Sequence, residues 1–172
     1  MPLLLTTKDF AILETMRDRC LSPRSAYGQL LARKIAEAEI VFSDDIEADS
    51  VTLNTRLRYS RNGGGAAACL LVQAEVHGVV GLTLPLTTLR GLALLGLRAG
   101  ESVTVIDDSG REETLHVTQV DYQPEAARRE RSQLASERMA SRPHLRLVHS
   151  AERVALRLPE TIWPDDPGPS AA

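Results

Sequence analysis

Residues 88–96, with the sequence TLRGLALLG, constrain the fold of this chain more than any other segment. Gly96 stands where a left-handed C-terminal helix cap belongs, and the alternating run 102–105 follows it closely. Apolar residues recur every three or four positions, so a short helix would place them on one buried face. These residues are Leu89, Leu92, Ala93 and either Leu95 or Gly96. The segment therefore predicts a short helix that leads directly into a strand.

The first fifty residues predict two helices. Thr6 or Thr7 can cap the first helix, which would end near Arg19. The Ser-Pro pair at 22–23 is typical of a helix start, and apolar spacing continues the second helix to Val41. The short connection favours an antiparallel helical hairpin. At about 1.5 Å per residue, its first arm would project roughly 20 Å.

An acidic segment, residues 43–50, follows the hairpin and contains four carboxylates. Clustered carboxylates can hold magnesium or calcium, but the spacing of an EF-hand loop is absent. We expect a solvated linker without a metal site, which makes residues 1–49 the hairpin together with its linker.

Residues 50–126 predict a β domain. Apolar and polar residues alternate over 51–59, which indicates a strand with one buried face. The glycine-rich turn 61–65 leads into another apolar strand, whereas a phosphate-binding loop would lead into a helix. A short strand near 82–84 precedes the helix, and the turn at 107–110 joins two strands after it. We expect an α+β fold: a twisted antiparallel sheet with one packed helix.

Residues 127–172 form an arginine-rich extension and a proline-rich tail. The segment 126–139 is compatible with an exposed helix, and short alternating runs follow at 145–147 and 154–158. Residues 159–172 contain four prolines and predict disorder. Acidic residues are interleaved with the arginines, which favours a solvated or intramolecular role over nucleic-acid binding.

Composition narrows the possible functions further. The net charge of −3 argues against a globally basic nucleic-acid binder. Cys20 and Cys69 stand far apart, which suggests neither a disulfide framework nor a zinc site. The sequence shows no recognisable catalytic motif, signal peptide or membrane span, so we expect a soluble cytoplasmic protein that is not an enzyme and needs no cofactor.

Two segments resemble the C-terminal domain of the Gre-type transcription factors: residues 93–101 (ALLGLRAGE) and 120–126 (VDYQPEA). Residues 51–59 (VTLNTRLRY) are similar to the start of the β domain in the regulator of nucleoside diphosphate kinase family, within the GreA/GreB superfamily. The resemblance covers roughly residues 1–126. It implies an FKBP-like fold for the β domain.

The resemblance also implies a function. Gre-type factors bind RNA polymerase at the rim of its secondary channel, and the helical hairpin points into the channel mouth. In the cleavage factors, a long hairpin carries an acidic tip that helps to hold a catalytic magnesium ion. The tip here offers one carboxylate, Asp18, among arginines that include Arg19 and Arg24. We expect polymerase binding in competition with longer Gre-type factors, without stimulated transcript cleavage.

The polymerase contact is expected at the turn before the short helix. Gre-type factors typically carry Ser-Pro ahead of this helix, whereas the proline of this chain, Pro85, comes earlier. Arg90 could pair with acidic residues of the partner. The same residues could equally serve to cap and pack the start of the helix. The candidates are Thr87, Thr88, Leu89 and Arg90.

Two other functions stay open on the sequence. An FKBP-like fold could be a peptidyl-prolyl isomerase, although such a pocket needs aromatic residues and this chain has few. The chain could also be an interaction module whose tail binds another protein, without any contact to polymerase. We expect a monomer that neither recognises DNA sequence nor enters a membrane.

Overall fold

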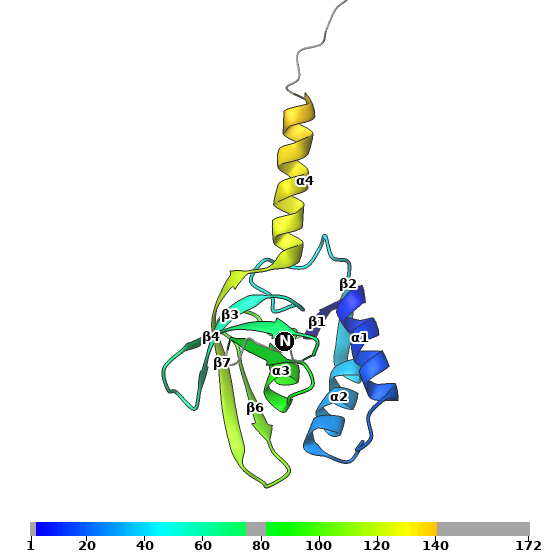
Figure 1. Ribbon diagram of the computed structural model, residues 1–172, viewed down its shortest axis with the longest axis vertical. Helices are drawn as coiled ribbons and strands as arrows, with labels where there is room; N and C mark the ends of the chain where they lie inside the picture. The colour runs from blue at the N-terminus through cyan, green and yellow to red at the C-terminus, as the bar shows by residue number, and fades with distance from the viewer. Residues whose placement is uncertain (1–2, 75–81, 141–172) are drawn as a thin grey trace, which may run out of the picture. The chain divides into compact units, whose positions relative to one another are not determined.

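The computed structural model describes residues 3–74 and 82–140. A helical hairpin with a small two-stranded sheet precedes a five-stranded sheet, and a further helix follows (Figure 1). Within the described ranges, no helix is both long and apolar enough to span a bilayer. The elements in order are β1 (Leu3–Thr6), α1 (Thr7–Asp18), α2 (Ala26–Glu37), β2 (Ala38–Val41), β3 (Arg56–Arg61), β4 (Ala67–Val72), β5 (Thr83–Pro85), α3 (Leu89–Leu94), β6 (Ser102–Ile106), β7 (Glu112–Tyr122) and α4 (Pro124–Ala140).

Both predicted N-terminal helices are present, but the second starts later than expected. Thr6 caps α1, because its Oγ1 accepts a hydrogen bond from Asp9 N at 3.1 Å. The cap of α2 is Ser25, whose Oγ accepts from Gly28 N at 3.1 Å. The predicted start at Ser22 is therefore wrong, since both serines satisfy the local capping rule and the folded chain uses the later one. A Cβ at Gly28 would lie 2.6 Å from Ser22 O, so the connection folds closely over the first turn of α2.

The end of the second helix also differs from the prediction. Helix α2 ends at Glu37, and the next four residues form β2 rather than a further helical turn. Strand β2 pairs in parallel with β1, with Leu3 opposite Ala38. Ile40 and Val41 are β-branched residues that favour a strand once a partner strand is available. That partner is more than thirty residues away in sequence, so helical spacing alone could not reveal it.

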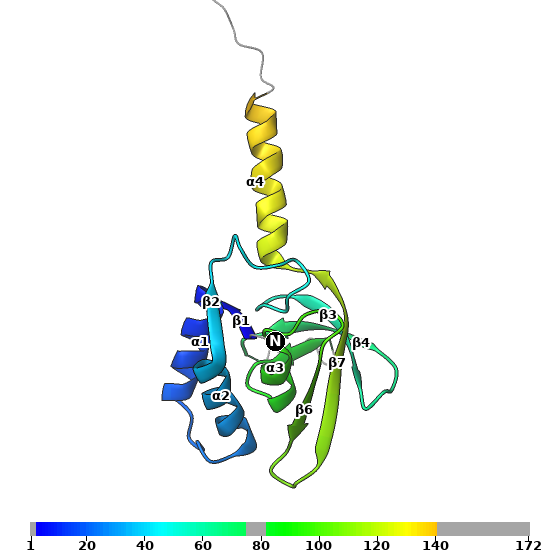
Figure 2. The same ribbon diagram turned by 180° about the vertical axis from the view of Figure 1, so that it is seen from behind.

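The hairpin packs along the β domain instead of projecting from it (Figures 1 and 2). Near the tip, Tyr27 Oη donates to Leu86 O at 3.1 Å, and farther along α2, Lys34 Nζ donates to Leu95 O at 2.5 Å. Leu31 of α2 is buried in the same core cluster as the sheet. The expected projection of roughly 20 Å is therefore wrong, because burying the apolar face of α2 needs the β domain.

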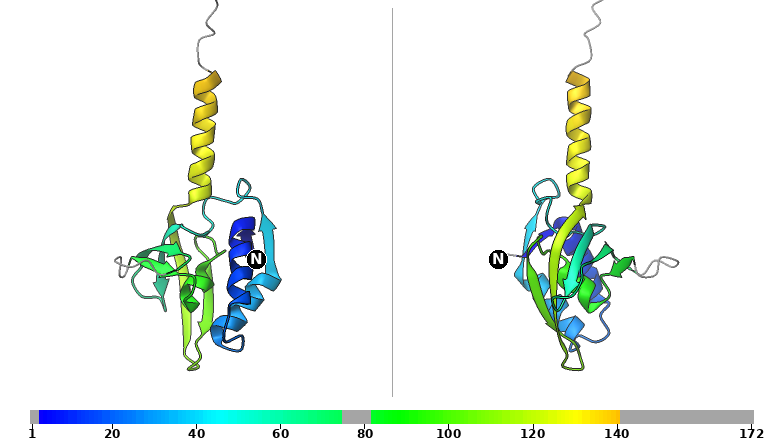
Figure 3. Two further views of the ribbon diagram at one scale, coloured as in Figure 1. Left: turned by 45° about the vertical axis from the view of Figure 1, so that its right-hand side comes forward. Right: turned by 90° about the vertical axis from the view of Figure 1, so that its left-hand side faces the viewer.

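The five strands follow the order β5-β4-β3-β7-β6, and α3 packs against them, which confirms the α+β fold class (Figure 3). The neighbours are antiparallel except β4 and β5, which are parallel. The β3–β4 turn at Asn62 and Gly63, both with positive φ, confirms the predicted hairpin. The strand predicted over 51–59 begins only at Arg56.

Residues 51–55 form an irregular segment that bonds to the chain around α3. Gly96 N donates to Val51 O, and Val51 N donates to Leu97 O, each at 2.8 Å. Gly96 has a φ of +79°, which confirms the predicted left-handed residue after α3. The predicted alternation is wrong over the first three of these residues, because Thr52 is as buried as Val51 and Leu53; its hydroxyl bonds to Thr55 and Glu125 inside the fold.

Helix α4 confirms the helix expected after the sheet, although it begins at Pro124, two residues earlier than predicted. Thr52 Oγ1 donates to Glu125 Oε2 at 2.7 Å, and Arg129 Nη1 donates to Ser43 O at 3.1 Å. These bonds tie its first turns to the acidic linker and the irregular segment. The runs predicted at 145–147 and 154–158 and the tail 159–172 lie outside the described residues.

Candidate functional site

The loop between β5 and α3 is held by hydrogen bonds to its main chain from β4 and from the hairpin. Leu86 is fully buried, its N–H donates to Val72 O at 2.7 Å, and its carbonyl accepts from Tyr27 of the hairpin. Thr87 and Thr88 follow and are exposed. The loop therefore presents two hydroxyl side chains on a fixed backbone.

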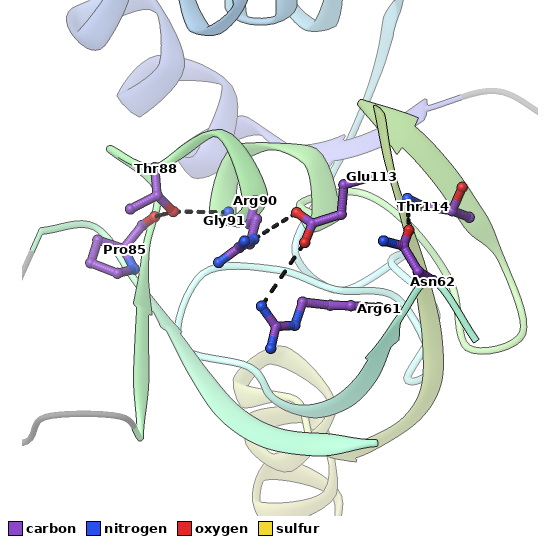
Figure 4. Close-up of polar contacts among 8 residues, drawn as sticks. All are labelled: Arg61, Asn62, Pro85, Thr88, Arg90, Gly91, Glu113 and Thr114. Atoms are coloured by element: carbon purple, nitrogen blue, oxygen red, sulfur yellow. Dashed lines mark hydrogen bonds and ion pairs between the residues drawn. The ribbon is translucent and has the colours of Figure 1, made fainter. Parts of the chain in front are cut away.

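Thr88 closes a tight turn against Pro85 (Figure 4). Its Oγ1 donates to Pro85 O at 2.8 Å and accepts from Gly91 N at 3.1 Å, which makes Thr88 the N-cap of α3. A Cβ at Gly91 would lie only 2.1 Å from Pro85 O, so this position requires glycine. The capping role expected as one alternative for Thr88 is confirmed, and its side chain remains exposed.

Arg90 belongs to a cluster of two arginines and one carboxylate (Figure 4). Its Nε donates to Glu113 Oε2 at 2.6 Å, and Arg61 Nη1 lies 4.0 Å from Glu113 Oε1. The hydrogen bond to Glu113 raises the pKa of Arg90. The side chain of Arg90 stays 45% exposed, so the cluster offers positive charge to solvent from a fixed position.

Glu113 is the member of this cluster that sequence reasoning missed. In the β6–β7 register it lies opposite Val105, which is buried, and it shares its strand phase with Leu115 and Val117. Alternation therefore places a carboxylate on the buried face of β7, where it needs a partner. The alternation of β7 could therefore have predicted that Glu113 is paired with a cation. No feature of the nearby sequence identified Arg90 as that cation.

The hairpin tip carries the other predicted residues. Asp18 Oδ1 forms an ion pair with Arg17 Nη2 at 3.2 Å, and both side chains are largely exposed. Arg19 is the C-cap of α1, and Arg24 lies exposed in the connection. Leu21, at the turn itself, is 98% exposed.

The structure brings some residues of the two predicted groups to shared hollows. A groove of about 490 Å³ is lined by Arg19 and Leu21 from the tip and by Thr87 from the loop. A second hollow of about 520 Å³ is lined by Arg24 and Leu89. Segments more than sixty residues apart in sequence therefore contribute to neighbouring surfaces. We name as the contact surface the set Arg19, Arg24, Thr87, Thr88, Leu89 and Arg90.

This arrangement suits recognition of an acidic, partly apolar surface, because it combines guanidinium groups, hydroxyls and the half-buried Leu89. Within residues 3–74 and 82–140, no three His, Cys, Asp or Glu side chains come close enough together to hold a metal ion. Cys69 is buried, and burial raises the pKa of its thiol to about 11.

Comparison with solved structures finds a protein of similar fold. The chain matches the prokaryotic transcription elongation factor GreA/GreB from Nitrosomonas europaea with a TM-score of 0.57 and 22% identity, over 71% of this chain and 99% of that one. At this identity the match shows a shared fold. Gfh1 of Thermus thermophilus also matches, at 14% identity over 70% of this chain and 99% of that one, but its TM-score of 0.32 supports no argument. Scans against protein families and curated proteins found no match.

Proposed function

We propose that this chain is a transcription regulator of the GreA/GreB superfamily, in the regulator of nucleoside diphosphate kinase family, that binds RNA polymerase at the rim of the secondary channel. The observation that carries the proposal is the fold shared with a GreA/GreB elongation factor over nearly all of that factor's length. The convergence of the hairpin tip and the α3 loop supports it, because these are the two parts expected to meet polymerase.

Arg90 is the proposed charged contact. Glu113 accepts from its Nε and so fixes the direction of the guanidinium, while the side chain remains 45% exposed. A positioned guanidinium loses less side-chain freedom on pairing with a carboxylate of the partner than a free one would. Thr87 and Leu89 add a hydroxyl and an apolar contact on either side of the helix cap.

We further propose that binding excludes longer Gre-type factors without stimulating transcript cleavage. The carboxylate of Asp18 is ion-paired to Arg17 and stands next to Arg19, which makes it a poor ligand for magnesium. Helix α2 is bonded to the β domain from its first residue onward, since Ala26 N donates to Asp108 Oδ1 at 2.6 Å. In this arrangement the tip stays close to the β domain, which favours occupation of the docking site over delivery of a catalytic group.

Purified core RNA polymerase tests both parts. The full chain should be retained by immobilised polymerase, and an excess of a GreA or GreB factor should displace it. With a polymerase stalled on a backtracked transcript, the chain should leave the transcript intact and slow the cleavage that an added Gre factor causes. Absence of retention, or retention that a Gre factor leaves unchanged, would contradict polymerase docking. Cleavage above background would contradict the second proposal alone.

Matched neutral substitutions separate binding by Arg90 from its structural role. Arg90→Gln and Glu113→Gln both break the same ion pair, but only Arg90→Gln removes the proposed contact. We expect Arg90→Gln to weaken retention about tenfold, because a hydrogen bond between charged groups contributes about 1.5 kcal/mol or more. Glu113→Gln should weaken retention less than Arg90→Gln does, because the guanidinium remains and the glutamine oxygen can still accept a hydrogen bond from it. Equal losses in the two variants would make Arg90 a purely structural residue.

A further inference from the structure

Strand β2 has a partner strand on one side and an open edge on the other. It pairs in parallel with β1, and the two form a separate two-stranded sheet. Among the described residues, no other strand pairs with β2 and no loop makes a main-chain hydrogen bond to it. In the left view of Figure 3, this strand, drawn in cyan, lies at the margin of the hairpin. Alternate main-chain groups of a strand point to opposite sides, so half of those in β2 are open to a further strand.

Two large apolar side chains are exposed along this strand and just after it. Ile40 is 50% exposed and Phe42 is 74% exposed, and they stand two residues apart, which is the spacing of side chains on one face of a strand. A turn fixes the chain beyond them, because Phe42 O accepts from Asp45 N at 3.0 Å and Arg129 Nη1 donates to Ser43 O at 3.1 Å. We name residues 38–45 the β2 edge.

The β2 edge carries negative charge. Its exposed carboxylates form no ion pair among the described residues; they are Glu39, Asp44 and Asp45. Residues 35–55 contain neither lysine nor arginine, so cations reach this surface from other segments. Arg129 does so through its bonds to main-chain carbonyls, and Lys8 stands exposed in the first turn of α1, which packs against β2. The carboxylates outnumber these two cations.

The remaining charges near the linker do not reverse this balance. Arg98 and Glu47 pair with each other at 2.7 Å, so their charges cancel. Asp49 adds a further exposed carboxylate beyond the turn. Three charged residues at the end of α2 line a hollow of about 450 Å³ beside β6: Arg33, Lys34 and Glu37. The surface around β2 therefore keeps an excess of negative charge.

We propose that the β2 edge binds a basic, extended segment of a partner protein as an added strand. Main-chain groups of the segment pair with the open edge, and its lysines or arginines face Glu39, Asp44 and Asp45. Apolar side chains that alternate with these cations cover Ile40 and Phe42. The negative charge disfavours nucleic acid and acidic peptides. It also disfavours a second copy of this chain, because two β2 edges would bring like charges together.

This interaction is separate from the contact proposed for polymerase. The contact surface lies at the hairpin tip and at the start of α3, and none of its residues belongs to the β2 edge. Strand β2 follows the opposite end of α2, which is twelve residues long and therefore rises roughly 18 Å from the tip. A partner can thus occupy the β2 edge without displacing Arg19 or Arg24 from their own contacts.

A synthetic peptide of sequence TRVRVRVT, blocked at both ends, is a direct probe because its arginines and valines alternate. Nuclear magnetic resonance spectra of the full chain should show shifts concentrated in residues 38–45 and slower amide exchange in β2 on binding. A neutral peptide, TQVQVQVT, should bind at least fivefold more weakly, because it retains the main-chain groups and loses the charges. Equal binding of the two peptides, or shifts located elsewhere, would overturn the proposal.

Two variants test the charged and the apolar part of the β2 edge separately. Glu39→Lys should weaken binding of the arginine peptide about fivefold, whereas Glu112→Lys, which reverses an exposed glutamate on β7, should leave it within about twofold. Phe42→Ser should also weaken binding about fivefold, and Leu134→Ser, at an exposed leucine of α4, should not. These side chains are exposed, so the variants should unfold at the same urea concentration as wild type. Unchanged peptide binding by Glu39→Lys and Phe42→Ser would overturn the proposal.

Two further measurements separate this proposal from its alternatives. Protection of the outward amides of β2 in the free protein would overturn it, because a second copy or the chain itself would then already fill the edge. Glu39→Lys should be retained by immobilised polymerase as well as wild type is. Loss of that retention would place the β2 edge in the polymerase interface and overturn its assignment to a separate partner. Peptide binding is measured without polymerase, so the two proposals can fail independently.

Discussion

Asp9 and Lys34 are ionisable side chains buried where the hairpin meets the β domain. Asp9 is 1% exposed, its Oδ2 accepts from Leu53 N at 3.4 Å, and its Oδ1 has no hydrogen-bond partner within the described residues. Burial raises the pKa of Asp9 to about 6. Burial lowers the pKa of Lys34 to about 7, and its Nζ bonds to Leu95 O. Both residues therefore join the hairpin to the β domain, although removing their charged forms from water is unfavourable.

Asp9→Asn should change how stability depends on pH. In the wild type, the native state holds the Asp9 proton more tightly than the unfolded state does. The contribution of this proton to the free energy of unfolding is therefore complete below pH 3.8 and is lost as the pH rises through about 6. The shift of about two pKa units corresponds to a loss of about 3 kcal/mol. The asparagine variant should escape this loss and gain stability relative to wild type between pH 4 and pH 7.5.

Urea unfolding at the two pH values measures the effect of Asp9→Asn. Asp18→Asn is the matched control, because Asp18 is exposed and paired with Arg17. That control should show no comparable change between the two pH values. A difference between Asp9→Asn and wild type that is the same at pH 4 and pH 7.5 would contradict burial as the cause of the raised pKa.

At the scale of elements, α1, α3 and the two tight hairpin turns follow from local signals. Thr6 and Thr88 cap their helices, as expected for a threonine that stands just before a run of apolar residues at helical spacing. The two turns carry Asn-Gly and Asp-Ser-Gly sequences, which are typical of hairpin turns. Strand β2 and the late start of β3 did not follow from such signals. Each depends on a partner that is distant in sequence: β1 for β2, and the chain around α3 for residues 51–55.

Asp108 joins two elements that the sequence keeps far apart. Its Oδ1 accepts from Ala26 N at the start of α2, so the β6–β7 turn caps a helix of the hairpin. Asp108→Ala should cost about 1 kcal/mol of unfolding free energy, which is typical for loss of a helix cap. It should also speed hydrogen exchange of the Ala26 amide. Asp108→Asn retains an acceptor oxygen and should lose less than half as much; equal losses would show that the cap is not the cause.

For the molecule as a whole, the hairpin and the β domain share one core. Leu13 and Leu31 from the hairpin belong to the same buried cluster as Leu57 and Leu115 from the sheet. The described residues, 3–74 and 82–140, accordingly form one compact unit by their contacts. The boundary near residue 49, drawn from composition, therefore marks a change in secondary structure within a continuous core.

Leu31→Ala tests whether this core unfolds as one unit. Leu31 is 1% exposed, and truncation of such a leucine costs about 2–5 kcal/mol. We expect the most protected amides of β7 to lose hydrogen-exchange protection as much as those of α2, because one cooperative unit shares the loss. Leu134→Ala, on the exposed face of α4, should change stability by less than about 0.5 kcal/mol. Loss of protection in α2 alone would show that the hairpin opens independently.

The sequence by itself indicated the α+β class and the short-range features: threonines able to cap α1 and α3, and the glycine turns. These depend on hydrogen bonds and spacings within a few residues, which the order of amino acids specifies directly. The tertiary structure alone decided that the hairpin lies on the β domain, that β1 pairs with β2, and that Glu113 holds Arg90. Each of these joins residues far apart in the chain. Which of many possible partners they meet is set by the burial of the common core.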